Sequence, residues 1–111
     1  MKNKNNKYSK SINLFSLQKK VIVIFGGSGK LGQEFAKTLS LNGAKVYILD
    51  IKKKLINHNN IFFIKCDVQK IKHINHAFKK IIEKEKKIDT VIYNVYSKPK
   101  NYYKSFQNYD L

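Results

Sequence analysis

Three glycines, Gly26, Gly29 and Gly32, follow the β-branched and aromatic run Val21–Phe25 at intervals of three residues. A chain that turns from a strand into a helix within a few residues needs positive φ, which glycine adopts without a Cβ clash. The bare backbone of such a turn lets a phosphate reach the free N–H groups of the next helix, and the last glycine allows that helix to pack closely. The pattern therefore predicts a pyrophosphate site formed by Gly26, Ser28, Gly29, Lys30, Leu31 and Gly32.

An acidic residue, Asp50, ends the next apolar run, Val46–Asp50. A carboxylate at this place accepts hydrogen bonds from the ribose hydroxyls of an adenosine and repels a 2′-phosphate. The pattern predicts a dinucleotide as partner and favours NAD over NADP, although the lysines of Lys52–Lys54 would partly compensate for the repulsion. The alternative is that Asp50 only caps the loop after its strand.

The remaining residue types that bind metals or act as nucleophiles are sparse. His73 and His76 lie three residues apart in a lysine-rich segment without a third ligand, so we expect a solvated helix face and no metal site. Cys66 is the only cysteine, which excludes an internal disulfide and suits a reducing compartment. We expect Cys66 to be a small buried residue at the end of a strand and not a nucleophile.

The elements that must position these residues alternate between strand and helix patterns. We predict strands over Val21–Phe25, Val46–Asp50, Ile61–Ile64 and Ile88–Tyr93, and helices over Gln33–Asn42, closed by Gly43, and Val68–Lys86. The second helix has Ile71, Ile74, Phe78, Ile81 and Ile82 on one face and lysines opposite. The alternation predicts an α/β fold with βαβ units and a parallel sheet. We divide the chain into a basic tail (1–13), a domain (14–96) and a segment rich in tyrosine and lysine (97–111).

The composition of the 111 residues is extremely basic. All 23 basic residues are lysine, against seven acidic residues, which gives a formal charge of +16. This charge predicts weak, salt-dependent contacts with nucleic acid, but specific recognition is disfavoured because the lysines are spread along the sequence and arginine is absent. A nucleic-acid-binding or protein-interaction module stays open as an alternative function. No apolar run is long enough for a membrane span or a signal peptide, so we expect a cytoplasmic protein without membrane contact.

Taken in order, these motifs resemble the short-chain dehydrogenase/reductase family. The three glycines match its TGxxGxxG turn, with Phe25 in place of the threonine. Asp67-Val68 resembles the Asp-Val pair that contacts adenine, and Ile88–Tyr96 is similar to IDxLVNNAG, with Tyr93 and Val95 as departures. The stretch that follows, YSKPKNYY, resembles a bacterial subgroup associated with sugar or flagellin modification.

This resemblance implies a partial Rossmann fold, a doubly wound parallel sheet of about four strands in the order 3-2-1-4. It implies that Asp67 and Val68 lie at the adenine and Asn94 at the ribose–nicotinamide side. A full-length relative would transfer a hydride between NAD and an alcohol or carbonyl. Family catalysis uses a serine and a Tyr-xxx-Lys pair in the second half of the fold, which these residues do not reach, so we expect the chain to be inactive alone.

Two further expectations concern the end of the sequence. Tyr96 and Lys100 have the Tyr-xxx-Lys spacing, but Pro99 lies between them in a loop, so we reject them as a catalytic pair and assign no catalytic residue. If the sheet ends at the fourth strand, Val91–Tyr93 forms an exposed apolar edge. We expect this edge to pair with another copy or with a partner chain.

Overall fold

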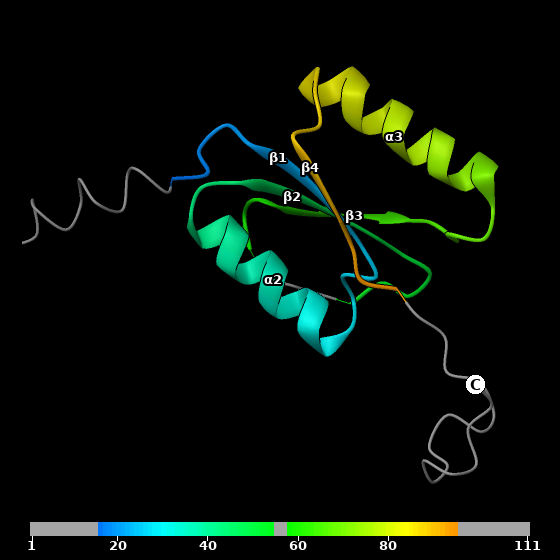
Figure 1. The fold of residues 1–111 in the computed structure, drawn as a ribbon, viewed down its shortest axis with the longest axis horizontal. Coiled ribbons are helices and arrows are strands. Elements are labelled where there is room, and N and C mark those ends of the chain that lie inside the picture. The colour runs from blue at the N-terminus through cyan, green and yellow to red at the C-terminus, as the bar shows by residue number, and fades with distance from the viewer. Residues whose placement is uncertain (1–15, 55–57, 96–111) are drawn as a thin grey trace, which may run out of the picture.

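The computed structural model describes residues 16–54 and 58–95 (Figure 1). The predicted tail (1–13) and C-terminal segment (97–111) lie outside the described residues, as do Tyr96 and Lys100.

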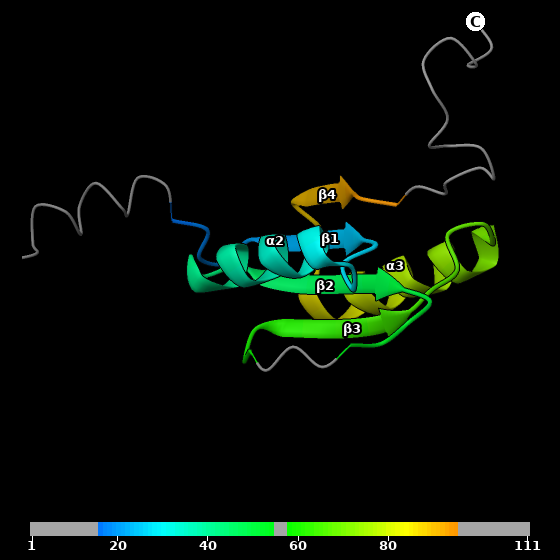
Figure 2. The same cartoon turned by 90° about the horizontal axis from the view of Figure 1, so that it is seen from below.

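Four parallel strands form one sheet in the order β3-β2-β1-β4 (Figure 2), which confirms the predicted order. The strands are β1 (Val21–Phe25), β2 (Lys45–Asp50), β3 (Ile61–Lys65) and β4 (Thr90–Tyr93). In the middle of the sheet, Val23 of β1 is level with Tyr47 of β2 and with Val91 of β4. Because all strands run the same way, their carboxyl ends meet at one edge of the sheet, where α/β folds bind ligands.

Two helices, α2 (Lys30–Leu41) and α3 (Ile71–Glu85), cover opposite faces of the sheet (Figure 1). Ala36 of α2 packs with Ile22, Ile24, Val46 and Ile48, and the other face of the sheet packs with Ala77 and Ile81 of α3. All five residues of β1 are buried because the strand is covered on both faces and paired on both sides. This explains its continuous apolar sequence.

The helix boundaries differ from the predicted ones at the amino ends. The first helix begins at Lys30 instead of Gln33, since the chain becomes helical directly after Gly29. The second begins at Ile71 instead of Val68. Residues 67–70 form a turn instead, in which the Lys70 N–H donates to the Asp67 carbonyl (2.9 Å). Gly43 follows the last turn of α2 with φ +102°, as its predicted place at the helix end requires.

The apolar face predicted for α3 is only partly covered. Ile74, Phe78 and Ile81 pack against the sheet as predicted, but 67% of Ile71 and 47% of Ile82 is exposed. Both isoleucines lie on a flank of the helix that none of the described elements covers. The fourth strand begins at Thr90 instead of Ile88.

Candidate functional site

The glycine turn connects β1 to α2 at the carboxyl edge of the sheet. Gly26 has φ +79°, and a Cβ there would lie 2.5 Å from the carbonyl oxygen of Asn94. A Cβ on Gly32 would lie 2.6 Å from the carbonyl oxygen of Gly26, so the first turn of α2 packs directly on the turn backbone. Gly29 differs from the prediction: its φ of −75° is open to any residue, and the nearest atom to its Cβ position is 3.8 Å away.

The amino end of α2 is open for an anion. Gly29 is the N-cap residue, it offers no side-chain cap, and the first turn contains no acidic residue. The first backbone hydrogen bond of the helix runs from the Gln33 N–H to the Gly29 carbonyl (2.9 Å). The N–H groups of the three preceding residues, Lys30 to Gly32, therefore have no carbonyl within the helix and can bind a phosphate.

Asp50 at the end of β2 joins the glycine turn to the loop after β2. Its Oδ2 accepts a hydrogen bond from the Ser28 N–H (3.1 Å). Its Oδ1 accepts from the Ile51 N–H (2.7 Å) and the Lys52 N–H (3.3 Å). These contacts show the loop-capping role that was the alternative for Asp50. A carboxylate has about four acceptor positions, so one on Oδ2 stays available.

Two polar side chains fix the turn in this conformation. The Ser28 hydroxyl donates to the Lys52 carbonyl (2.5 Å), and the Gln33 side-chain amide donates to the Ser28 carbonyl (2.9 Å). The sequence predicts a role for Ser28 but none for Gln33. A glutamine on a helix gives no signal of its own, because its partner becomes apparent only when the turn is folded back on the helix.

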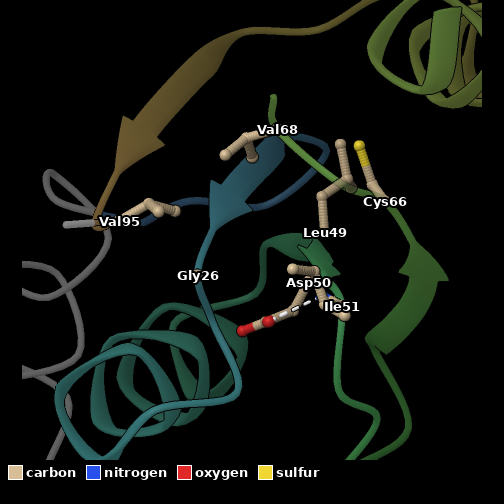
Figure 3. A pocket seen from close by; sticks show the side chains of 7 residues that line it. All are labelled: Gly26, Leu49, Asp50, Ile51, Cys66, Val68 and Val95. Atoms are coloured by element: carbon tan, nitrogen blue, oxygen red, sulfur yellow. Dashed lines mark hydrogen bonds between the residues drawn. The ribbon is translucent and has the colours of Figure 1, made fainter. Parts of the chain in front are cut away.

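A cavity opens beside the turn, between the ends of β1 and β2 (Figure 3). It is lined by Gly26, Leu49, Asp50, Ile51, Cys66, Val68 and Val95. A second, more open hollow is lined by Gly26, Gly29, Asp50, Asn94 and Val95. Since the two share three residues, they form one site that contains five of the residues predicted to bind a cofactor: Gly26, Gly29, Asp50, Val68 and Asn94.

The other predicted cofactor residues lie around this site. Ser28 and Gly32 shape the turn, while Lys30 and Leu31 line a separate outward hollow with Glu34. The Asp67 carboxylate accepts from the Gln69 N–H (3.0 Å) and caps the turn before α3. The assignment of these residues to a cofactor stays a prediction.

Two apolar side chains, Cys66 and Val95, form part of the cavity wall. Cys66 is fully buried, and burial raises the pKa of its thiol, helped by the neighbouring Asp67 carboxylate. This thiol is therefore a wall of the cavity and a poor nucleophile. In the sequence, Val95 is only a departure from a motif. In the structure its Cγ2 lies 2.9 Å from the position that a Cβ on Gly26 would take, so Val95 narrows the cavity at the turn.

Within residues 16–54 and 58–95, no cluster of three or more His, Cys, Asp or Glu side chains is arranged to hold a metal ion. The part of the chain that the structure describes also contains no helix of the length and apolarity needed to cross a membrane.

The sequence and the fold agree with those of known proteins. Residues 20–109 match the family of short chain dehydrogenases. The chain is 31% identical over 85 residues to short-chain dehydrogenase reductase 3c of Arabidopsis thaliana, which covers 70% of this chain and 33% of that protein. This chain belongs to the short chain dehydrogenase family, and it spans about a third of the length of the curated relatives it matches.

Solved structures show the same architecture. The 3-ketoacyl-(acyl-carrier-protein) reductase of Brucella melitensis, complexed with NADH, superposes with a TM-score of 0.63 at 27% identity over 68% of this chain and 34% of its own. A short chain dehydrogenase of Leptospira borgpetersenii with bound NAD⁺ superposes with a TM-score of 0.63 at 24% identity, over 81% of this chain and 37% of its own. The fold is the Rossmann-like α/β fold that the motifs predicted.

Proposed function

We propose that this chain binds NAD at the carboxyl edge of its sheet and forms the cofactor-binding part of an oxidoreductase. The observation that carries the proposal is the Asp50 carboxylate, which is tied to the Ser28 N–H and lines both hollows of the site. The uncapped amino end of α2 lies beside it and suits the pyrophosphate. Two relatives of this fold were solved with NADH or NAD⁺ bound, which supports the same ligand class here.

Each part of the site suits one part of the dinucleotide. The N–H groups that open α2 would hold the pyrophosphate, and Asp50 would accept hydrogen bonds from the adenosine ribose. The apolar wall that includes Val68 and Cys66 suits the flat adenine ring. Asn94 lies at the end of β4, on the side where the nicotinamide ribose would lie.

Bound NAD would supply the hydride acceptor of the reaction, and these residues would bind and orient it. We further propose that the 111 residues alone do not turn over an alcohol or carbonyl. The family's serine and Tyr-xxx-Lys pair act at the substrate oxygen, and the resemblance places them in the second half of the fold. The chain covers about a third of its relatives' length, which supports the proposal that these residues bind the cofactor and that the catalytic residues lie in another part of the fold.

Titration of NAD and NADP into the purified chain tests the cofactor proposal. We expect saturable binding of NAD with NADP weaker, because the Asp50 carboxylate repels a 2′-phosphate. Asp50→Ala should weaken NAD by about tenfold, as loss of a charged hydrogen-bond acceptor predicts, and bring the two affinities closer together. An unchanged ratio of affinities would show that Asp50 only shapes the loop, and absence of binding to either dinucleotide would refute the proposal.

The control is Asp89, a second carboxylate that accepts a backbone hydrogen bond, at the opposite end of the sheet. Asp89 accepts a hydrogen bond from the Val21 N–H (2.8 Å), and this bond, with Lys87, lowers the pKa of Asp89. Asp89→Ala removes the same charge without touching the site. We expect it to leave the ratio of NAD to NADP affinity unchanged.

Among residues 16–54 and 58–95, β4 is an edge strand of the sheet, and we propose its free edge as a pairing surface. Val91 and Tyr93 are 46% and 66% exposed, and the run Thr90–Val95 contains no charge although the chain carries +16. We propose that a further strand pairs here, from another copy or from a partner chain. Val91→Lys should reduce self-association in sedimentation velocity, whereas the same change at the exposed Ile71 should not; equal effects would contradict pairing at β4.

A further inference from the structure

The outer surface of α3 carries basic side chains at every fourth residue. Lys72, His76, Lys80 and Lys84 are all exposed. Residues four apart are neighbours along a helix, and each step rises about 6 Å and turns about 40° around the axis, so these four form an inclined row that spans roughly 18 Å along the helix. We name these four residues the α3 ridge.

Too few acidic residues lie near the α3 ridge to neutralise its positive charge. Seven lysines and two glutamates lie between Lys70 and Lys87. Glu85 is turned inward, with its side chain 6% exposed, and pairs with Lys45 (3.0 Å). Among residues 16–54 and 58–95, no ion pair involves a member of the ridge, and Glu83 is the one exposed acid on α3.

The ridge is separate from the dinucleotide site. It lies on α3, on the face of the sheet opposite α2 (Figure 1), and none of its residues lines the hollows around the glycine turn. One end leans towards β3, since the Lys84 ammonium lies 4.5 Å from the centre of the Phe62 ring. A ligand on the ridge and a dinucleotide at the turn would therefore not compete.

We propose that the α3 ridge binds the phosphate backbone of a nucleic acid without reading its sequence. A row of basic side chains at regular intervals suits a strand of regularly spaced phosphates, and release of condensed counterions gives useful affinity from only a few lysines. The absence of arginine agrees with the lack of base reading. A lipid surface fits less well, because the apolar face of α3 is buried at Ala77 and Ile81 and its exposed isoleucines, Ile71 and Ile82, are eleven residues apart.

Fluorescence anisotropy with a labelled 20-base-pair DNA duplex tests the proposal on the full chain. The ridge variant is Lys72→Gln/Lys80→Gln/Lys84→Gln, and the matched control is Lys19→Gln/Lys20→Gln/Lys37→Gln, which removes the same charge at exposed side chains outside α3 and outside the dinucleotide site. We expect the ridge variant to raise the Kd at least tenfold and the control less than threefold. The slope of log affinity against log salt should become shallower by about 3 in the ridge variant, at roughly 0.9 per lost phosphate contact.

Three outcomes would overturn the proposal. Equal losses in the two variants would assign the binding to net charge, and absence of saturable binding would exclude a nucleic-acid partner. Ridge-dependent binding to vesicles of 30% phosphatidylserine that exceeds binding to the duplex would assign the surface to a membrane. Circular dichroism and NAD titration should be unchanged in both variants, which separates failure here from failure of the dinucleotide proposal or of folding.

Discussion

The two ends of β2 each engage a carboxylate, and the two carboxylates are used in opposite ways. At the carboxyl end, the hydrogen bonds that Asp50 accepts within the described residues come from backbone N–H groups, and Asp50 stays partly exposed beside a cavity. At the amino end, Glu85 of α3 reaches back to Lys45 and to the Tyr47 hydroxyl, and its side chain is almost fully buried. The first carboxylate is placed where a ligand can use it, and the second is enclosed by protein.

The difference contrasts the carboxylate proposed to bind a ligand with one that has a structural role. Glu85 has a partner on each oxygen, and burial raises the pKa of Tyr47, as do the hydrogen bond to Glu85 and its charge, so the hydroxyl stays protonated. Asp50 has spare acceptor capacity and faces a hollow that other site residues share. Access and unused hydrogen-bonding capacity distinguish the two better than residue type does.

We expect the largest effect on stability at the carboxyl edge of the sheet, from the substitution Gly32→Ala. The added Cβ would lie 2.6 Å from both the Gly26 oxygen and the Gly27 Cα, so α2 must move away from the turn. We expect a loss of about 3 kcal/mol in the free energy of unfolding, as overpacking of backbone predicts, together with loss of NAD binding. Urea unfolding and NAD titration measure the two effects.

Gly29→Ser is the matched control for the stability effect. Its Cβ position is free, its φ is ordinary, and serine is a good N-cap residue. We expect the unfolding free energy to change by less than about 0.5 kcal/mol or to rise. If the two variants were equally destabilised, close packing at Gly32 would not be the reason that this position is glycine.

We expect the second largest effect on stability near the amino end of β2, from the substitution Tyr47→Phe. The hydrogen bond from the Tyr47 hydroxyl, with Lys45, lowers the pKa of Glu85 below its ordinary value of 4.5, although burial acts in the opposite sense. Removing the hydroxyl should cost about 2 kcal/mol, the value typical of a hydrogen bond to a charged group. NAD affinity should be unchanged, because the site lies at the other end of the sheet.

The pH dependence of stability sharpens this prediction. Since the pKa of Glu85 is lower in the folded chain than in the unfolded one, its contribution is complete above pH 4.5 and is lost as the pH falls through the folded value. Tyr47→Phe should make the decline in stability below pH 4.5 shallower in urea unfolding series. An identical decline in both proteins would show that Glu85 gains nothing from Tyr47.

The sequence predicted the carboxyl end of the sheet much better than the amino end. The glycine spacing and the acid after a strand are local patterns, because the turn and its neighbouring strand impose residue types within a short stretch. The pairing of Tyr47 with Glu85 joins residues 38 positions apart, and each looks ordinary within its own element. The exposure of Ile71 and Ile82 escaped prediction for a related reason: periodicity defines the apolar side of a helix, but only the packed fold shows which part of that side is covered.

The smallest effect, at Lys30, separates stability from binding within the turn itself. Lys30 opens α2, where its ammonium opposes the positive end of the helix dipole and no acidic residue in the first turn offsets it. Lys30→Gln should therefore raise the unfolding free energy of the free chain by about 0.5 kcal/mol and weaken NAD severalfold, because a bound pyrophosphate would reverse the sign of the local field. Paired urea unfolding and NAD titration measure both quantities on one variant. A higher unfolding free energy together with weaker NAD binding would show that Lys30 destabilises the free chain and stabilises the complex. A higher unfolding free energy with unchanged NAD affinity would place the pyrophosphate away from Lys30.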